Sequence, residues 1–245
     1  MKVVMIGATR GMGRALARKL IEQGASLFLL GREAEELSSS AADLSVRAGQ
    51  GQVGMSYCDL ADPETFESAL MTADEALGGF DTVIVTAGMF ATQDELETDT
   101  NLAFRLMSVN YAGTVAFCEH ARRMLLARGG GHLVVFSSVA GDRGRKPVGI
   151  YGSSKAGLSH YLESLDHKYR GQGLVTLCVK PGFVKTGMTQ GLKPPPFAGE
   201  PEQVAGDVYK AITKNKPMLY TPRMWALVML IIRNLPRFIM RKINF

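Results

Sequence analysis

A glycine run after the first apolar segment limits what this chain can fold into more than any other feature. Lys2–Ile6 is apolar after its lysine, and Gly7-Ala8-Thr9-Arg10-Gly11-Met12-Gly13 follows it directly, ahead of a segment with helical periodicity. A strand that turns through glycines into a helix lets the main chain approach a pyrophosphate, whose charge faces the helix N-terminus. The spacing is G-x-x-x-G-x-G, and glycine-rich turns also form for packing reasons. In this position the run predicts a nucleotide-binding turn.

Two arginines indicate which dinucleotide the turn would hold. Arg10 lies inside the glycine run, and Arg32 follows Gly31 at the end of the second apolar segment. An NAD-binding fold would place an acid near this point to hold the ribose 2′-hydroxyl, whereas two guanidinium groups favour a 2′-phosphate. The alternative is that both are solvated surface arginines. We therefore predict NADP(H). Asp59, after the third apolar segment, could accept from the adenine amino group or cap the following turn.

Short apolar runs alternate with longer amphipathic segments along the chain. The expected strands are Lys2–Ile6, Ser26–Leu30, Val53–Cys58, Asp81–Thr86, His132–Ser137 and Leu174–Lys180; the expected helices include Gly13–Gln23, Pro63–Leu77, Leu102–Arg128 and Tyr151–Arg170. Unbroken apolar strands are typical of parallel sheets buried on both faces. We expect an α/β fold, a single-domain Rossmann-type doubly wound parallel sheet of about seven strands in the order 3-2-1-4-5-6-7, with helices on both faces.

Composition excludes several classes of protein. Three widely spaced cysteines suit buried thiols in a reducing compartment, and the four histidines show no metal-ligand spacing, so we predict no metal.

From Tyr209 onward there are eight basic residues and no acid, while the rest of the chain has 20 basic against 23 acidic residues. The basicity is therefore local, and no nucleic-acid partner is expected. Since no signal peptide is evident, we expect a cytoplasmic protein.

Three residues in the second half of the chain suggest the chemistry. Tyr151 and Lys155 are one helical turn apart, and Ser138 follows the fifth strand, at the edge where open α/β sheets place ligands. A tyrosine with a pKa of about 10 transfers protons poorly at neutral pH unless a nearby cation lowers that pKa. Lys155 can supply this charge, and Ser138 can donate to a carbonyl oxygen. The alternative is an exposed Tyr–Lys pair on a helix surface. No histidine and acid accompany Ser138 as they would a nucleophile.

With these motifs in place, the chain resembles the short-chain dehydrogenase/reductase family over residues 1–190. The matching pieces are the glycine run, Asp59-Leu60, Ala87-Gly88, Asn110, Ser137-Ser138, Tyr151-Gly-Ser-Ser-Lys155 and Pro181-Gly182 followed by Thr186. The resemblance implies a catalytic set of Asn110, Ser138, Tyr151 and Lys155, with Asn110 fixing a water next to Lys155. It implies cofactor contacts from Gly7, Thr9, Arg10, Gly11, Met12, Gly13, Arg32, Asp59, Leu60, Ala87, Gly88, Tyr151, Lys155, Pro181, Gly182, Val184 and Thr186. Ile6 and Thr86 depart from the family pattern, which usually has a threonine and an asparagine there, so an amide that braces the central sheet is missing.

The C-terminal segment gives a first indication of the substrate. We expect residues 1–216 to form the catalytic domain, with a substrate loop at about 188–199, and residues 217–245 to form a last strand and a basic amphipathic tail. The apolar run Met224–Ile232 is too short to span a bilayer, and Arg233, Arg237 and Arg241 recur every four residues. This pattern favours peripheral contact of residues 223–245 with an anionic membrane, at its inner face. The alternative is a tail that packs on the protein.

Within the family, the chain is most similar to membrane-associated reductases of decaprenyl-phosphoryl 2-keto-pentofuranose. The similarity lies in Ser137–Arg143, Tyr151–Gly157, Pro181–Thr189 and the proline-bounded tail. It implies an NADPH-dependent reduction of a ketone to a secondary alcohol on a lipid-linked or membrane-held substrate, either a keto-sugar on a polyprenyl carrier or a keto-lipid such as a 3-keto-sphingoid base. A soluble 3-oxoacyl-thioester or small-ketone reductase is the alternative, and a non-catalytic NADP(H)-sensing protein is a further one. The family resemblance also implies a homodimer or homotetramer.

Overall fold

Seven parallel strands form one sheet at the centre of the molecule. The computed structural model describes residues 1–49, 51–195 and 197–243, so the expected substrate loop and tail each include residues outside these ranges (196; 244 and 245). The strands are β1 (Lys2–Ile6), β2 (Ser26–Gly31), β3 (Val53–Tyr57), β4 (Thr82–Val85), β5 (Gly131–Phe136), β6 (Leu174–Pro181) and β7 (Met218–Thr221). They are ordered β3-β2-β1-β4-β5-β6-β7, which confirms the expected fold.

The order reverses between β1 and β4, and this reversal creates the site. Both strands are central: Met5 of β1 pairs with Leu29 on one side and with Ile84 on the other. The chain leaves β1 toward β2 and leaves β4 toward β5, so the loops after these two strands diverge and open a crevice. The central strands β1 and β4 are almost fully buried, as their unbroken apolar sequences predict, whereas the edge strand β3 is partly exposed along its length.

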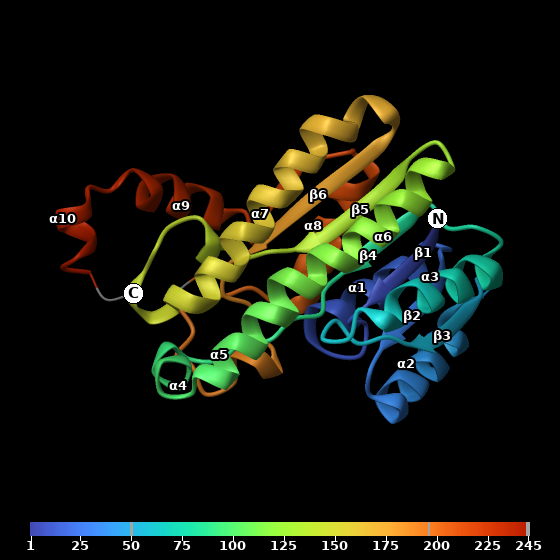
Figure 1. Cartoon of the computed structure of the whole chain (residues 1–245), viewed down its shortest axis with the longest axis horizontal. Helices are drawn as coiled ribbons and strands as arrows, with labels where there is room; N and C mark the ends of the chain where they lie inside the picture. The colour runs from blue at the N-terminus through green and yellow to red at the C-terminus, as the bar shows by residue number, and fades with distance from the viewer. Residues whose placement is uncertain (50, 196, 244–245) are drawn as a thin grey trace.

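Helices cover both faces of the sheet, and alternate strand residues point to opposite layers. The helices are α1 (Gly11–Glu22), α2 (Ala34–Arg47), α3 (Glu64–Leu77), α4 (Gln93–Thr98), α5 (Thr100–Met107), α6 (Thr114–Ala127), α7 (Gly149–Tyr169), α8 (Pro201–Thr213), α9 (Met224–Asn234) and α10 (Arg237–Met240). Val4 and Ile6 contact the layer of α3, α6 and α7, which crosses the front of the sheet in Figure 1. Val3 and Met5 contact the layer of α1, α2 and α8.

The long helix expected at Leu102–Arg128 is interrupted. A π-helical segment, Ser108–Gly113, lies between α5 and α6 and has Asn110 within it. Such wide turns insert a residue into a helix and commonly occur at functional sites. Gly113 lets the segment approach its neighbour, because a Cβ there would lie 1.8 Å from the carbonyl oxygen of Leu60.

The tail lies at the end of the sheet farthest from α2 (Figure 1). One face of α9 is buried: Trp225, Met229 and Ile232 pack with Val139, which follows β5. Its outer face leaves large apolar side chains exposed, namely Met224, Leu227, Leu230 and Ile231. No helix among the described residues is both long enough and apolar enough to cross a membrane. The inner face of α9 thus packs on the protein, which was one of the two alternatives for the tail. Contact of the outer face with a membrane stays a hypothesis.

Candidate active site

A cleft of about 430 Å³ opens at the carboxyl ends of β1, β2 and β4. Eight of the residues expected to contact the cofactor line it: Gly7, Thr9, Arg10, Arg32, Asp59, Leu60, Ala87 and Gly88. Gly11, Met12 and Gly13 form the start of α1 beside the cleft and do not line it. The cleft therefore has the position and the main-chain lining that a dinucleotide needs.

Two glycines of the run are required by steric contacts. Gly7 has a φ of 97°, and a Cβ on it would lie 2.4 Å from the main-chain nitrogen of Ala87. A Cβ on Gly13 would lie 2.0 Å from the carbonyl oxygen of Gly7. Since any larger residue would push β1, β4 and α1 apart, these glycines keep the turn closed. The residues present thus fit a nucleotide bound against the turn.

Thr86 forms a brace between the central strands, although the asparagine amide that usually forms it in the family is missing from this sequence. Its hydroxyl, after β4, lies 3.1 Å from the carbonyl oxygen of Ile6 and 2.9 Å from that of Gly7, and donates to them. A hydroxyl therefore joins the ends of β4 and β1 where the family usually has an amide. Asp59 adopts the capping role, because its carboxylate accepts from the main-chain nitrogen of Ala61 at 2.9 Å. It still lines the cleft, so contact with adenine stays a prediction.

Both arginines expected to select a 2′-phosphate are paired with carboxylates. The guanidinium of Arg10 donates to Glu36 on α2, with Nε 2.9 Å from Oε2. Arg32 donates from Nε to Glu33 at 3.0 Å. Glu33 and Glu36 both line the cleft, and neither was identified from the sequence. A 2′-phosphate would therefore have to compete with these carboxylates for the two guanidinium groups.

A second cavity, of about 220 Å³, contains the catalytic hydroxyl groups. Ser138 and Tyr151 line it, and the rest of its lining is mostly apolar: Met12, Phe90, Ser137, Val139, Ala140, Arg145, Val148, Pro181, Gly182, Phe183, Val184, Thr186, Met188, Thr189, Leu192 and Trp225. Tyr151 and Ser138 are hydrogen-bond partners. The ring of Phe90 meets that of Tyr151 edge to face, with centroids 5.1 Å apart. The expected proton donor, Tyr151, and the expected carbonyl donor, Ser138, thus line the same cavity.

Burial controls the acidity of Tyr151 in this structure. It raises the pKa of the phenol, and the hydrogen bond with Ser138 opposes the rise. The expected lowering of this pKa by Lys155 is not seen: its Nζ lies 5.9 Å from the ring centroid, and the shift is set by burial and by Ser138. A raised pKa keeps the hydroxyl protonated, which is the form that can donate a proton to a ketone.

Lys155 and Asn110 are both buried. Nζ of Lys155 donates to the carbonyl oxygen of Phe136 at 2.9 Å, and burial lowers the pKa of the amine to about 8. The amide of Asn110 accepts from the main-chain nitrogen of Met89 at 2.7 Å and donates to its carbonyl oxygen at 2.8 Å. Gly88 lies between the two, since a Cβ there would be 3.1 Å from Asn110 Oδ1 and 3.5 Å from Lys155 Nζ. The water relay implied by the family resemblance stays a prediction.

The loop after β6 closes the catalytic cavity together with the tail. Pro181, Gly182, Val184 and Thr186, expected to contact the cofactor, all line this cavity. Trp225 of α9 packs against Gly182 so closely that a Cβ there would lie 2.2 Å from indole atoms. The indole Nε1 also donates to the carbonyl oxygen of Phe197 at 3.2 Å. Trp225 lies within the segment 217–245 predicted to form the last strand and tail, and nothing in the local sequence pattern indicates that it reaches the catalytic cavity.

Comparison with known proteins agrees with this geometry. The family model described as short chain dehydrogenase matches residues 1–196. An uncharacterized oxidoreductase of Mycobacterium tuberculosis is 34% identical over 242 residues, covering 98% of this chain and 96% of the relative. An uncharacterized oxidoreductase of Streptomyces coelicolor is 32% identical over 243 residues, with 98% and 95% covered. A variant of actinorhodin polyketide ketoreductase, solved with NADPH, has a TM-score of 0.80 at 22% identity, with 90% of this chain and 95% of that one covered.

Proposed function

The chain belongs to the short-chain dehydrogenase/reductase family, and we propose that it is an NADPH-dependent reductase of a ketone on a lipid-linked or membrane-held substrate. The observation that carries the proposal is the meeting of Ser138 and Tyr151 in one largely apolar cavity, next to a cleft that fits a dinucleotide. The membrane-held substrate is supported by the exposed apolar face of α9 on the same helix that encloses the cavity through Trp225.

Each catalytic residue has a role that its surroundings support. The hydroxyl of Tyr151 gives its proton to the ketone oxygen, and Ser138 donates a hydrogen bond to the same oxygen as negative charge develops there. The ammonium group of Lys155 stabilises the phenolate that remains. Bound nicotinamide supplies the hydride, with Gly7, Thr9 and Ala87 among the residues that would hold the dinucleotide.

The preference for NADPH rests on Arg10 and Arg32. Both guanidinium groups line the cleft near the end of β2, where the ribose of the adenosine would lie. Their pairing with Glu36 and Glu33 positions them at that point, and a 2′-phosphate offers a stronger, doubly charged partner. We expect lower KM values for NADPH than for NADH.

A substrate screen tests the proposal. NADPH oxidation is measured with a polyprenyl-phosphate-linked 2-keto-pentofuranose, a 3-keto-sphingoid base and a 3-oxoacyl thioester. We expect turnover of a lipid-linked ketone, and loss of roughly 10²- to 10⁴-fold in rate for Tyr151→Phe. Turnover of the thioester alone would favour the soluble reductase instead. A Tyr151→Phe protein with the wild-type rate would remove the mechanism.

A further inference from the structure

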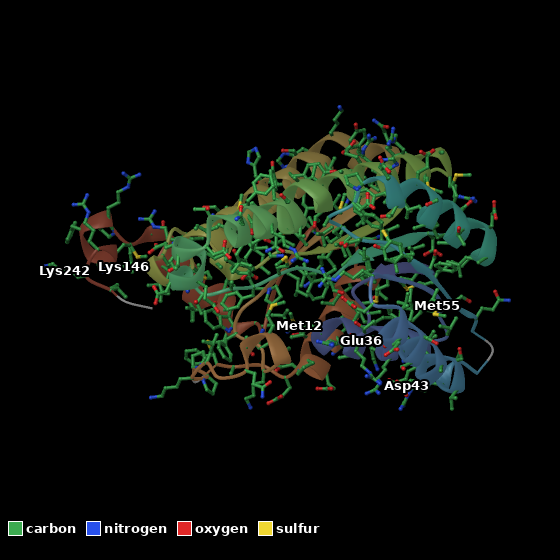
Figure 2. All side chains as sticks on the ribbon, turned by 60° about the horizontal axis from the view of Figure 1, so that its bottom comes forward. Met12, Glu36, Asp43, Met55, Lys146 and Lys242 are labelled. Atoms are coloured by element: carbon green, nitrogen blue, oxygen red, sulfur yellow. The ribbon has the colours of Figure 1, made fainter. Side chains whose placement is uncertain are left out.

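A third cavity, of about 380 Å³, lies between the loop that precedes α7 and the end of the tail. Its lining residues are Arg143, Gly144, Arg145, Lys146, Arg237, Met240, Arg241 and Ile243. Five of these side chains are basic and none is acidic. Figure 2 shows Lys146 and Lys242 at this end of the molecule, far from Glu36 at the dinucleotide cleft. We call this space the cationic cavity.

The loop and the tail are held together around the cationic cavity. Arg143 donates from its guanidinium to the carbonyl oxygen of Leu235, between α9 and α10, at 2.8 Å. Met240 packs with the cluster that contains Val139 and Trp225. The positive charges are therefore brought together by defined contacts from two segments about 90 residues apart, and not by chance exposure on one helix.

Asp142, the acid nearest in the sequence, is hydrogen-bonded to groups outside this cavity. Asp142 accepts from Lys180 Nζ at 2.7 Å and from the hydroxyl of Tyr220 at 2.5 Å, and its side chain is 3% exposed. Burial lowers the pKa of Arg145, although Asp142 acts in the opposite direction. Like charges gathered around a partly enclosed space repel one another, so an anion in the cavity is favoured.

Arg145 connects the cationic cavity with the catalytic one. Its side chain lines both spaces, and Val148, three residues further on, lines the catalytic cavity beside Tyr151. A single elongated molecule can therefore place an anionic group among the arginines and a carbonyl group at Tyr151. The cluster is separate from Arg10 and Arg32, which line the dinucleotide cleft.

We propose that the cationic cavity binds a phosphate ester carried by the substrate and so positions the ketone at Tyr151. This rests on the proposed reductase function. Planar guanidinium groups form paired hydrogen bonds with phosphate oxygens, which makes arginines from two segments a suitable phosphate site. Lipid phosphates and soluble phosphate-bearing thioesters such as acyl-coenzyme A share this chemistry, and the experiment separates them.

The test measures binding to the protein saturated with NADP⁺ by calorimetry. The probes are geranyl phosphate, acetoacetyl-coenzyme A, inorganic phosphate and uncharged geraniol. The variant Arg237→Gln/Arg241→Gln removes two exposed charges from the tail side, and Lys146→Gln removes one from the loop side. Lys214→Gln/Lys216→Gln is the matched control, because it removes two exposed charges that do not line the cavity.

We expect at least one phosphate ester to bind. Its Kd should rise about tenfold or more in the double arginine variant and roughly two- to fivefold in Lys146→Gln, and stay within about twofold in the control. Tighter binding of geranyl phosphate identifies a lipid phosphate, and tighter binding of the thioester identifies a soluble one. The proposal is overturned when neither ester binds, when inorganic phosphate alone binds, or when the substitutions leave the Kd unchanged.

Failure of this inference and failure of the reductase function have different signatures. If Tyr151→Phe abolishes ketone reduction but Arg237→Gln/Arg241→Gln does not affect it, the phosphate site is wrong and the reductase function stands. If a phosphate ester binds and its binding depends on Arg237 and Arg241, but no ketone is reduced, the phosphate site stands and the reductase function is wrong.

Discussion

The guanidinium of Arg10 and the carboxylate of Glu36 form an ion pair across the mouth of the dinucleotide cleft, with Nε 2.9 Å from Oε2. Arg10 belongs to the glycine turn and Glu36 to the first turn of α2, so the pair joins the two elements that would surround the adenosine ribose. Glu36 raises the pKa of Arg10, which keeps the guanidinium charged. The same carboxylate competes with any 2′-phosphate for this group.

Removing the carboxylate should strengthen the binding of NADPH. In Glu36→Gln the guanidinium of Arg10 loses its anionic partner, and a 2′-phosphate no longer faces a negative charge. We expect the KM for NADPH to fall by roughly two- to fivefold, since exposed ion pairs are weak, and the KM for NADH to change less. Glu35→Gln is the matched control, because Glu35 is exposed and does not line the cleft. An equal effect of both substitutions, or a wild-type preference for NADH, would contradict the assignment of Arg10.

The sequence predicts the sheet well because the strands are short, apolar runs whose pattern depends only on neighbouring residues. The same is true of the glycine turn and of the Tyr151–Lys155 spacing. It does not predict the Arg10–Glu36 pair, whose members are 26 residues apart and meet only because β1 and β2 are adjacent. Nor does it predict Trp225 against Gly182, which depends on how α9 crosses the end of the sheet. The π-helical turn at Asn110 is hidden by an apolar pattern that fits a continuous helix.

Replacement of the Thr86 hydroxyl should loosen the dinucleotide turn. Thr86→Val keeps the shape of the side chain but leaves the carbonyl oxygens of Ile6 and Gly7 without this donor. We expect a loss of about 1–3 kcal/mol in the free energy of unfolding, measured with urea, and weaker NADPH binding. Thr86→Ser keeps the hydroxyl and should stay close to the wild type. If Thr86→Val were as stable as Thr86→Ser and bound NADPH equally well, the brace would have no energetic role.

Lys155 should make stability depend on pH in the alkaline range. Its pKa in the folded protein, about 8, lies below the ordinary value of 10.5, so the unfolded chain binds more protons between these values. The contribution of Lys155 to the free energy of unfolding therefore rises with pH from about 8 to 10.5. Below pH 8 the buried amine is charged, and this charge lowers the free energy of unfolding by its full amount. The stability of Lys155→Met relative to the wild type should fall by roughly 3 kcal/mol across that interval.

The measurement is chemical unfolding of both proteins at pH values from 7 to about 10.5. Comparison of the two cancels groups that titrate in both, and Lys168→Met, on the exposed side of the same helix, controls for loss of a lysine. A difference between wild type and Lys155→Met that does not change with pH would mean that Lys155 titrates normally.

Gly182→Ala should displace Trp225 from the catalytic cavity. The added methyl group would lie 2.2 Å from indole atoms, so the indole must move toward solvent. Trp225 is the only tryptophan of the chain, and its emission should shift to longer wavelength while ketone reduction slows. Gly187→Ala, in open space on the same loop, is the control. In the double variant Gly182→Ala/Trp225→Leu, the smaller leucine leaves room for the added methyl group, so ketone reduction should recover. If it does not recover, a change in the loop after β6 accounts for the lost activity.

The exposed face of α9 should determine binding to membranes. Leu227 and Leu230 are 56% and 59% exposed, on a segment whose charged residues are all basic. Leu227→Gln/Leu230→Gln should weaken binding to vesicles that contain phosphatidylglycerol by about tenfold or more, because burial of the exposed half of each leucine contributes roughly 1 kcal/mol. Val46→Gln/Met71→Gln is the matched control, since both residues are exposed on α2 and α3. Sedimentation with vesicles measures the effect. Because α9 keeps Trp225 and Met229 buried in the variant, reduction of a water-soluble ketone should be unchanged. The prediction is wrong if the wild type binds vesicles only weakly, or if the control variant loses as much vesicle binding. The role of α9 would then be to pack on the protein.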